Sequence, residues 1–328
     1  MVAELVGNNL SVTFLFFIIS LAVVVFSADK FIDYSSVLAG RLGVSEFIIG
    51  LTLIALGTSV PEIFVGVQAV QNQVENLAVS AIIGSNISNI ALIFGIACIG
   101  RSLMPEKNAT RLRLYIPLVL SVVFLIYALI DLKIDKLESF MIIMILPIFL
   151  YCIYTDKNIG VTNENDISSM SNFILAGGLV LMTILLFYSA EGVVITGRNI
   201  ASELGISDTI VGLVLIAIGT SLPELAATMA AIVKKKTDLV VGNVIGSNIL
   251  NIALVIPIIG FFTTSNESLD SILLSRDMLV LSVATVLFAL FIYLQNKNPF
   301  RNLQIIKFGG YLFVFGYFIY ILFLANIL

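Results

Sequence analysis

The 328-residue chain contains no histidine, only two cysteines and few charged side chains, which make up 12% of the sequence. Without histidine, the protein can have neither a histidine-based metal centre nor a histidine proton relay. Cys98 and Cys152 stand alone, without the C-x-x-C spacing of redox or zinc motifs, so we expect both to be packing residues. The charged fraction is about half that of a typical soluble domain, which leaves no room for a large soluble domain.

Long apolar runs take the place of the missing charges. Hydrophobic residues make up 59% of the chain, and the mean hydropathy is +1.10. Runs of about 20 apolar residues, the length that crosses a bilayer as a helix, recur throughout. The first run has Glu4 but no basic segment before it, so we expect a retained helix rather than a cleaved signal peptide. The chain is therefore predicted to be an all-α polytopic membrane protein.

Ten apolar segments can be counted, and each is predicted to be a transmembrane helix. A polar stretch of residues about 155–171 is the longest hydrophilic segment and predicts a linker between two halves. We expect one transmembrane domain over residues 1–328, with a first unit of about 1–154 and a second of about 172–328. The ten segments cover residues about 10–38, 45–70, 77–100, 112–131, 138–154, 172–200, 207–233, 238–262, 276–295 and 302–327.

The second half of the sequence repeats the first at a constant offset of 162 residues. Glu62 aligns with Glu224, and Gly84-Ser85-Asn86 aligns with Gly246-Ser247-Asn248. Roughly half of the positions in 45–94 are identical to their partners. Because each unit has an odd number of helices, the two units cross the membrane in opposite directions. The sequence thus predicts two inverted five-helix repeats, an architecture typical of alternating-access transporters.

Basic residues predict the orientation of the chain. The odd-numbered loops carry eleven lysine and arginine residues, and the other loops and ends carry four. The positive-inside rule places the odd-numbered loops in the cytoplasm and both termini outside. We expect a multi-pass protein of the cell (inner) membrane, with the three lysines of 234–236 as a topology anchor. The eleven are Arg41, Arg101, Lys107, Arg111, Arg113, Lys157, Lys234, Lys235, Lys236, Lys297 and Arg301; the four are Lys133, Lys136, Arg198 and Arg276.

Each repeat carries one motif that does not suit a membrane-buried helix: residues 57–62 read GTSVPE and residues 219–224 read GTSLPE. A charge inside a membrane is expensive, and neither Glu62 nor Glu224 has a lysine or arginine in its segment. A duplicated carboxylate without a basic partner indicates a functional site, and its charge points to a cation.

The other polar groups of the motifs supply further oxygen atoms. Residues three and four apart share a helix face, so Thr58 and Ser59 lie beside Glu62. Pro61 has no N–H and leaves the carbonyl oxygen of Gly57 without its helical partner, which predicts that helices two and seven are broken at the motifs. The same reasoning applies in the second repeat to Thr220, Ser221 and Glu224.

Helices three and eight supply a second wall of polar side chains. Ser85 and Asn89 are four residues apart, as are Ser247 and Asn251, so each pair shares a helix face. All of these groups offer oxygen atoms, which suit hard cations such as Ca²⁺ and Na⁺ better than zinc or copper. The two motifs and the two walls together predict a cation site.

Residues 45–94 and 207–256 resemble the two alpha repeats of the calcium/cation antiporter superfamily, specifically its prokaryotic sodium/calcium exchanger-like branch. The resemblance rests on GTSVPE and GTSLPE, followed by GSNISN and GSNILN, and the predicted ten helices extend it over the whole chain. It implies that Glu62 and Glu224 are the central calcium ligands and also contact sodium. The other ligands it implies are the hydroxyls of Thr58, Ser59, Ser85, Thr220, Ser221 and Ser247 and the carbonyls of Ala55 and Ala217.

The middle polar pair of the second wall departs from the family pattern. The family commonly has one asparagine and one aspartate there, where this chain has Asn89 and Asn251. Two carboxylates balance one Ca²⁺, two Na⁺ or two H⁺, but not three Na⁺. The missing acid therefore makes a stoichiometry of three sodium ions less expected and proton coupling more plausible.

We predict a secondary active antiporter that exchanges Ca²⁺ for Na⁺ or H⁺ by alternating access and exports Ca²⁺. The amphipathic first and sixth helices are expected to slide over the core as a gate. Antiport of another cation (K⁺, Mn²⁺, Mg²⁺, or Na⁺ against H⁺) stays open as an alternative. An ion channel is a weaker alternative, because the duplicated buried acids argue against uncoupled flow.

The sequence offers no Ser/Lys pair, histidine or metal-thiolate set for intramembrane chemistry, so the protein is not expected to be an enzyme. A ten-helix metabolite carrier would have no use for twin oxygen-only motifs. No cofactor, nucleic acid or protein partner is expected. The expected partners are the transported ions and the lipid bilayer.

Overall fold

The structure, a computed structural model, describes residues 10–100, 112–155, 170–203, 221–263, 268–297 and 303–324. Regular structure in these ranges is entirely helical. Seven helices are long and apolar enough to cross a membrane, or up to eight if one bent pair is a single span. The predicted all-α membrane fold is confirmed at this level. Two further apolar helices, Ile116–Ala128 and Leu222–Val233, are shorter, and the count of ten spans stays a prediction.

The first half of the chain runs from one long helix to a pair of short ones. A capping box starts the last pair: the Glu138 N–H donates to Asp135 at 2.8 Å, and the Asp135 N–H donates to Glu138 at 3.0 Å. The α-helices are α2 (Leu10–Leu42), α3 (Glu46–Ile49), α4 (Ala55–Thr58), α5 (Val60–Asn72), α6 (Glu75–Ile87), α7 (Gly95–Gly100), α8 (Ile116–Ala128), α9 (Lys136–Ile143) and α10 (Ile145–Tyr154). Two π-helices, η1 (Gly50–Ile54) and η2 (Ser88–Phe94), and a 3₁₀-helix, η3 (Leu112–Tyr115), complete this half.

The second half begins with another long helix, and its predicted seventh segment is described only from Ser221 onward. Its α-helices are α11 (Asn172–Glu203), α13 (Leu222–Val233), α14 (Thr237–Leu250), α15 (Ile256–Phe262), α16 (Met278–Lys297) and α17 (Leu303–Leu324). The π-helices η4 (Asn251–Val255) and η5 (Leu273–Asp277) interrupt it.

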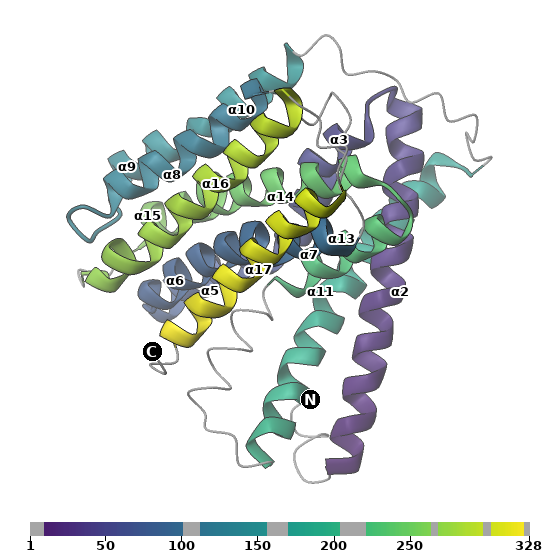
Figure 1. Cartoon of the computed structure of the whole chain (residues 1–328). Helices are drawn as coiled ribbons and strands as arrows, with labels where there is room; N and C mark the ends of the chain where they lie inside the picture. The colour runs from purple at the N-terminus through teal and green to yellow at the C-terminus, as the bar shows by residue number, and fades with distance from the viewer. Residues whose placement is uncertain are drawn as a thin grey trace.

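The two long helices α2 and α11 lie side by side and extend beyond the rest of the bundle (Figure 1). They are antiparallel, since Arg41 at the end of α2 donates to Asn172 at the start of α11 at 2.6 Å. Small residues allow them to approach closely, because a Cβ on Gly178 would lie 2.7 Å from the ring of Tyr34. The pair forms a separate arm against the remaining helices.

Helix α14 lies at the centre of the molecule and packs against α3, η1 and α4. A Cβ on Gly50 would lie 2.6 Å from the carbonyl oxygen of Leu239, and one on Gly246 would lie 2.6 Å from the Cβ of Ala55. Only glycine permits backbones to approach this closely. The contact brings the second GSN motif against the first GTS-x-PE motif, which no local pattern in the sequence requires.

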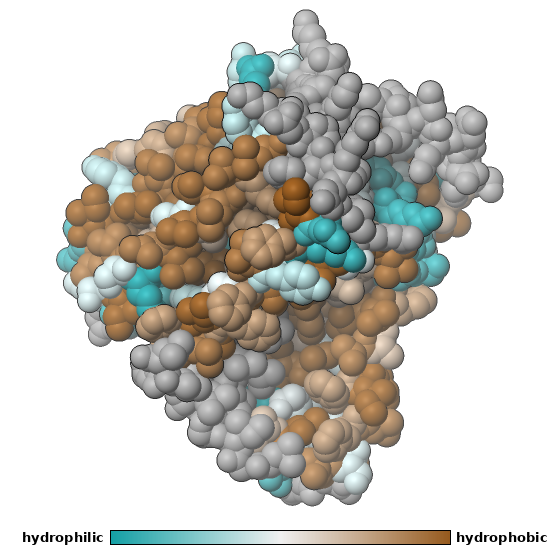
Figure 2. Space-filling view, viewed as in Figure 1, coloured by the Kyte–Doolittle hydropathy of each residue, from teal (hydrophilic) through white to brown (hydrophobic). Residues whose placement is uncertain are grey.

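Hydrophobic side chains cover most of the coloured part of the face in Figure 2, and hydrophilic ones gather in small patches. Large apolar residues such as Leu15, Phe173 and Phe315 are more than half exposed. This surface suits a bilayer, in which lipid tails solvate apolar side chains. Cys98 and Cys152 are both buried, as expected of packing residues.

Candidate cation site

A helix begins directly after the serine of each motif. Ser59 has φ −83° and ψ 6°, and Ser221 has nearly the same conformation, with φ −89° and ψ 8°. Helices α5 and α13 begin directly after these serines with proline in their first turn, where its missing N–H is not needed. Glu46–Thr58 and Val60–Asn72 meet at an angle of 41°. Two helix N-termini therefore lie inside the protein.

The motif glutamates lie in the first turns of α5 and α13. Glu62 and Glu224 are each 1% exposed, and their carboxylates are close enough to repel each other. Glu62 Oε1 accepts a hydrogen bond from Ser85 Oγ at 2.9 Å. Glu62 Oε2 and both oxygens of Glu224 have no hydrogen-bond partner among the described residues. One glutamate from each repeat thus reaches the same buried region.

Each motif also contacts the GSN segment of the other repeat. Thr58 Oγ1 lies 3.4 Å from Ser247 Oγ, and Ser221 Oγ donates to Ser85 Oγ at 3.1 Å. All four hydroxyls are buried. The structure therefore brings together side chains that the sequence separates by more than a hundred residues.

The first motif also faces the second glutamate. The side chains of Thr58 and Ser59 lie near the Glu224 carboxylate, and the Ser59 hydroxyl makes no hydrogen bond of normal geometry within the described ranges. The Ala55 carbonyl accepts from the Ser59 N–H at 3.0 Å and from Thr58 Oγ1 at 3.4 Å. The predicted counterparts of this group, Ala217 and Thr220, lie outside the described residues.

The two asparagines of the second wall are fully buried and lie in the π-helices η2 and η4. Asn251 Nδ2 donates to Ser85 Oγ at 3.3 Å and to Asn86 Oδ1 at 3.1 Å, while Asn251 Oδ1 is unpaired in the described structure. Neither amide atom of Asn89 has a partner there. A π-helical turn recurs at corresponding places in the two repeats, and such turns are frequent at functional sites.

The sequence did not point to Asn243, a further polar residue of this region. Asn243 is 3% exposed, and its Oδ1 accepts hydrogen bonds from Thr58 Oγ1 and from Ser247 Oγ, both at 3.3 Å. Its spacing of four residues from Ser247 is the same spacing that identified Asn251. The signal was lost because Ala81 occupies the corresponding position in the first repeat, so the residue is not duplicated.

The chemistry of this region is set by two carboxylates among neutral oxygens. No group of three or more His, Cys, Asp or Glu side chains that could hold a metal ion occurs in the described ranges. A buried polar atom without a partner costs about 1–3 kcal/mol, and more if it is charged. A hard cation would satisfy the unpaired oxygens of Glu62, Glu224, Ser59 and Asn251 together.

Comparison with known proteins points to one family. The chain matches the family described as sodium/calcium exchanger protein over residues 12–155 and 174–326. It is 31% identical to the inner membrane protein YrbG of Escherichia coli over 309 residues, which cover 90% of this chain and 93% of YrbG. It is 29% identical to the sodium/calcium exchanger MaX1 of Methanosarcina acetivorans over 320 residues, covering 85% of this chain and 91% of MaX1.

A solved structure is similar over nearly the full length. The sodium-calcium exchanger NCX_Mj, soaked with 10 mM Na⁺ and 10 mM Sr²⁺, superposes with a TM-score of 0.77 at 29% identity. The superposition covers 95% of this chain and 98% of that one. The likeness therefore includes the whole arrangement of helices and is not limited to the motifs.

Proposed function

The chain belongs to the sodium/calcium exchanger family of membrane antiporters, and from this premise we propose that it exchanges Ca²⁺ for Na⁺ or H⁺. The observation that carries the proposal is the pair of buried carboxylates, Glu62 and Glu224, one from each motif. They are close enough to repel each other, and three of their four oxygens have no partner among the described residues. A bound cation removes the cost of burying these charges.

The proposed ligand set holds the cation with charged and neutral oxygens. Two carboxylates balance either one Ca²⁺ or two monovalent cations, so the two kinds of ion compete for one site. The buried hydroxyls and amides complete a shell of oxygens, as a hard cation requires. The proposed ligands are Glu62, Glu224, Thr58, Ser59, Ser85, Asn89, Ser221, Ser247, Asn251 and the carbonyl of Ala55, with Thr220 and the carbonyl of Ala217 assigned by the repeat alone.

Competition at the carboxylates accounts for obligatory exchange. An empty site would bury two like charges away from water, and breaking a buried ion pair in this way costs about 3–5 kcal/mol. The protein would therefore change its accessible side only when the site is loaded. An inward gradient of Na⁺ or H⁺ then drives Ca²⁺ out of the cell.

We further propose the inverted architecture on which alternating access depends. Two five-helix repeats, about 1–154 and 172–328 with a linker at about 155–171, would form one domain in the cell (inner) membrane, with both termini outside. The matching conformations of Ser59 and Ser221 support the repeat, as do the π-helices η2 and η4. The arm of α2 and α11 is the part proposed to slide against the core.

Flux measurements in proteoliposomes test the function. We expect an outward Na⁺ or H⁺ gradient to drive uptake of radiolabelled Ca²⁺, and we expect almost no uptake without a gradient. Separate Na⁺ and pH gradients identify the coupling ion, and excess Mn²⁺, Mg²⁺ or K⁺ identifies competing cations. Liposomes without protein serve as the control. Ca²⁺ flux that needs no counter-ion would show a channel instead, and its absence under every gradient would exclude Ca²⁺ as substrate.

A further inference from the structure

Asn243 on α14 makes the two halves of the proposed site unequal. The residue is 3% exposed and lies one helical turn before Ser247. Its counterpart in the first repeat is Ala81, which cannot make a side-chain hydrogen bond. A role of Asn243 is therefore confined to one half of the pseudosymmetric site.

The amide oxygen of Asn243 accepts hydrogen bonds from two hydroxyls of the proposed ligand set. Thr58 Oγ1 and Ser247 Oγ each lie 3.3 Å from Asn243 Oδ1, and 3.4 Å from each other. A hydroxyl has one proton and two lone pairs. When its proton is given to Asn243, its lone pairs are left for a cation.

The other half of the site lacks this arrangement. Ser85 gives its proton to Glu62 Oε1 at 2.9 Å, so that this hydroxyl competes with a cation for the carboxylate. Ser221 in turn donates to Ser85 at 3.1 Å. The hydroxyl protons of Ser221 and Ser85 thus point along a chain of hydrogen bonds that ends on the Glu62 carboxylate, which is itself a proposed ligand.

We propose that Asn243 is a positioning residue that orients the hydroxyls of Thr58 and Ser247 so that their lone pairs face the transported cation. The inference rests on the proposed function, because it assigns a role around that same site. In this role Asn243 does not contact the cation itself but acts through Thr58 and Ser247, which are proposed ligands.

Equilibrium binding of radiolabelled Ca²⁺ to the purified chain in detergent tests this role and does not depend on transport. Asn243→Ala should raise the Kd about tenfold, since one orienting hydrogen bond is lost for each of two hydroxyls. In a Thr58→Val background the same change should raise the Kd only about threefold, because Ser247 alone is left to orient. Thr52→Val, which removes a hydroxyl that donates to Ile48 O of its own helical turn at 2.7 Å, is the control and should leave the Kd unchanged.

Asn243→Asp separates positioning from folding, because it keeps an acceptor oxygen at the same place. It should bind Ca²⁺ at least as tightly as the native chain. The inference is overturned if Asn243→Asp binds Ca²⁺ no more tightly than Asn243→Ala, or if the native chain binds no Ca²⁺. It is also overturned if the fold-changes in Kd caused by Asn243→Ala and Thr58→Val multiply in full in the double variant. Binding without any coupled flux would instead overturn the proposed antiport and leave the role of Asn243 standing.

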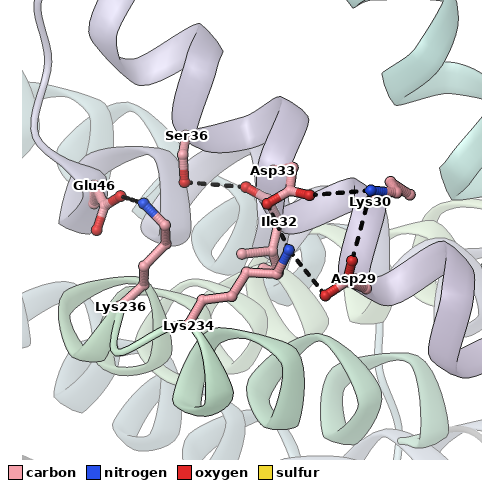
Figure 3. A network of polar contacts seen from close by, with 8 residues as sticks. All are labelled: Asp29, Lys30, Ile32, Asp33, Ser36, Glu46, Lys234 and Lys236. Atoms are coloured by element: carbon pink, nitrogen blue, oxygen red, sulfur yellow. Dashed lines mark hydrogen bonds and ion pairs between the residues drawn. The ribbon is translucent and has the colours of Figure 1, made fainter. Parts of the chain in front are cut away.

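A second inference comes from the ion pairs at the end of α13 (Figure 3). Lys234 reaches between two acidic side chains of α2 and pairs with Asp29 at 2.8 Å and with Asp33. Burial by itself would lower the pKa of Lys234, but its hydrogen bonds to the two aspartates outweigh burial and raise the pKa, which keeps the lysine charged. Lys236 pairs with Glu46 at the start of α3.

These pairs cannot form at the opposite end of the molecule. The counterparts of Lys234 and Lys236 in the first repeat are Asn72 and Val74, which carry no charge. Asp33 corresponds to Ile195. The cluster is therefore specific to one end, although the helices that carry it are duplicated.

We infer that the Lys234 cluster is an ionic latch that holds α2 against the end of α13 and so restrains the arm of α2 and α11 at one membrane face. Like the first inference, it rests on the proposed alternating access. Because the counterparts of Lys234 and Lys236 carry no charge, opening of the two faces is restrained unequally. The three lysines were interpreted from the sequence only as a topology anchor, and the ion pairs to Asp29 and Asp33 add a contact that this interpretation missed.

Hydrogen exchange of α2 in the purified protein tests the latch without a transport assay. Lys234→Asn, which installs the counterpart residue, should speed amide exchange in the part of α2 around Asp29 and Asp33 about fivefold. Lys235→Asn is the matched control, since Lys235 is exposed, and should have no effect. Lys234→Glu combined with Asp33→Lys should restore the slow exchange. Equal exchange in the two lysine variants, or no restoration by the charge swap, would overturn the latch.

Discussion

Glu62→Gln and Glu224→Gln should each abolish Ca²⁺ exchange. Glutamine keeps the size of the side chain but removes the charge that a divalent cation needs inside the protein. Removing one partner of a buried ion pair costs about 3–5 kcal/mol, which predicts a loss of at least about 100-fold in Ca²⁺ affinity. The measurement is Ca²⁺ uptake in proteoliposomes under an outward Na⁺ or H⁺ gradient, together with Ca²⁺ binding in detergent.

Glu75→Gln is the matched control for both glutamate changes. Glu75 is also a poorly exposed carboxylate, at 9%, but it lies at the start of α6 and accepts a hydrogen bond from Thr263 at 2.6 Å. Glutamine can still accept that bond, so exchange should continue. If either Glu62→Gln or Glu224→Gln keeps near-native exchange while the protein is folded, the assignment of the site is wrong.

Exchange by the native chain should be electroneutral, and Asn251→Asp should make it electrogenic. With two carboxylates, the site is neutral when loaded either with one Ca²⁺ or with two monovalent ions. A third carboxylate beside Ser85, where Asn251 Nδ2 now donates at 3.3 Å, would be balanced only by a third monovalent ion. Each additional charge moved across the membrane couples exchange to the potential by about 2.3 kcal/mol per 100 mV.

A potential imposed with valinomycin and a K⁺ gradient distinguishes the two cases. The native protein should reach the same Ca²⁺ gradient with and without the potential, while Asn251→Asp should respond strongly. Asn251→Ala is the control, because it changes the site without adding charge and should remain insensitive to the potential. A native exchange that follows the potential would show that the site carries a charge beyond Glu62 and Glu224.

Much of the proposed site could be inferred from the sequence because its chemistry is unusual for a membrane-buried segment. Glu62 and Glu224 stand out in any apolar run, and the 162-residue offset identifies their neighbours by comparison alone. Proline and serine in the motifs act locally on the backbone, so the helix starts after Ser59 and Ser221 follow from residue types. These features need no knowledge of which helices touch.

Asn243 and the Lys234 cluster could not be predicted in the same way. Neither is duplicated in the repeat, so internal comparison points away from both. Asn243 acquires its role only because glycines let α14 approach the first motif and bring Thr58 within 3.3 Å. Lys234 acquires its partners only because the end of α13 lies against α2.

The sequence by itself determined the membrane class, the helical fold, the family resemblance and the two carboxylates, because each depends on composition or on residues close together in the chain. Only the tertiary structure decided which groups meet across the repeats and which polar atoms are left unpaired. The physical reason is that hydrogen bonds and ion pairs act over about 3 Å. A sequence pattern predicts the face on which a side chain lies, but packing of whole helices decides what lies opposite it.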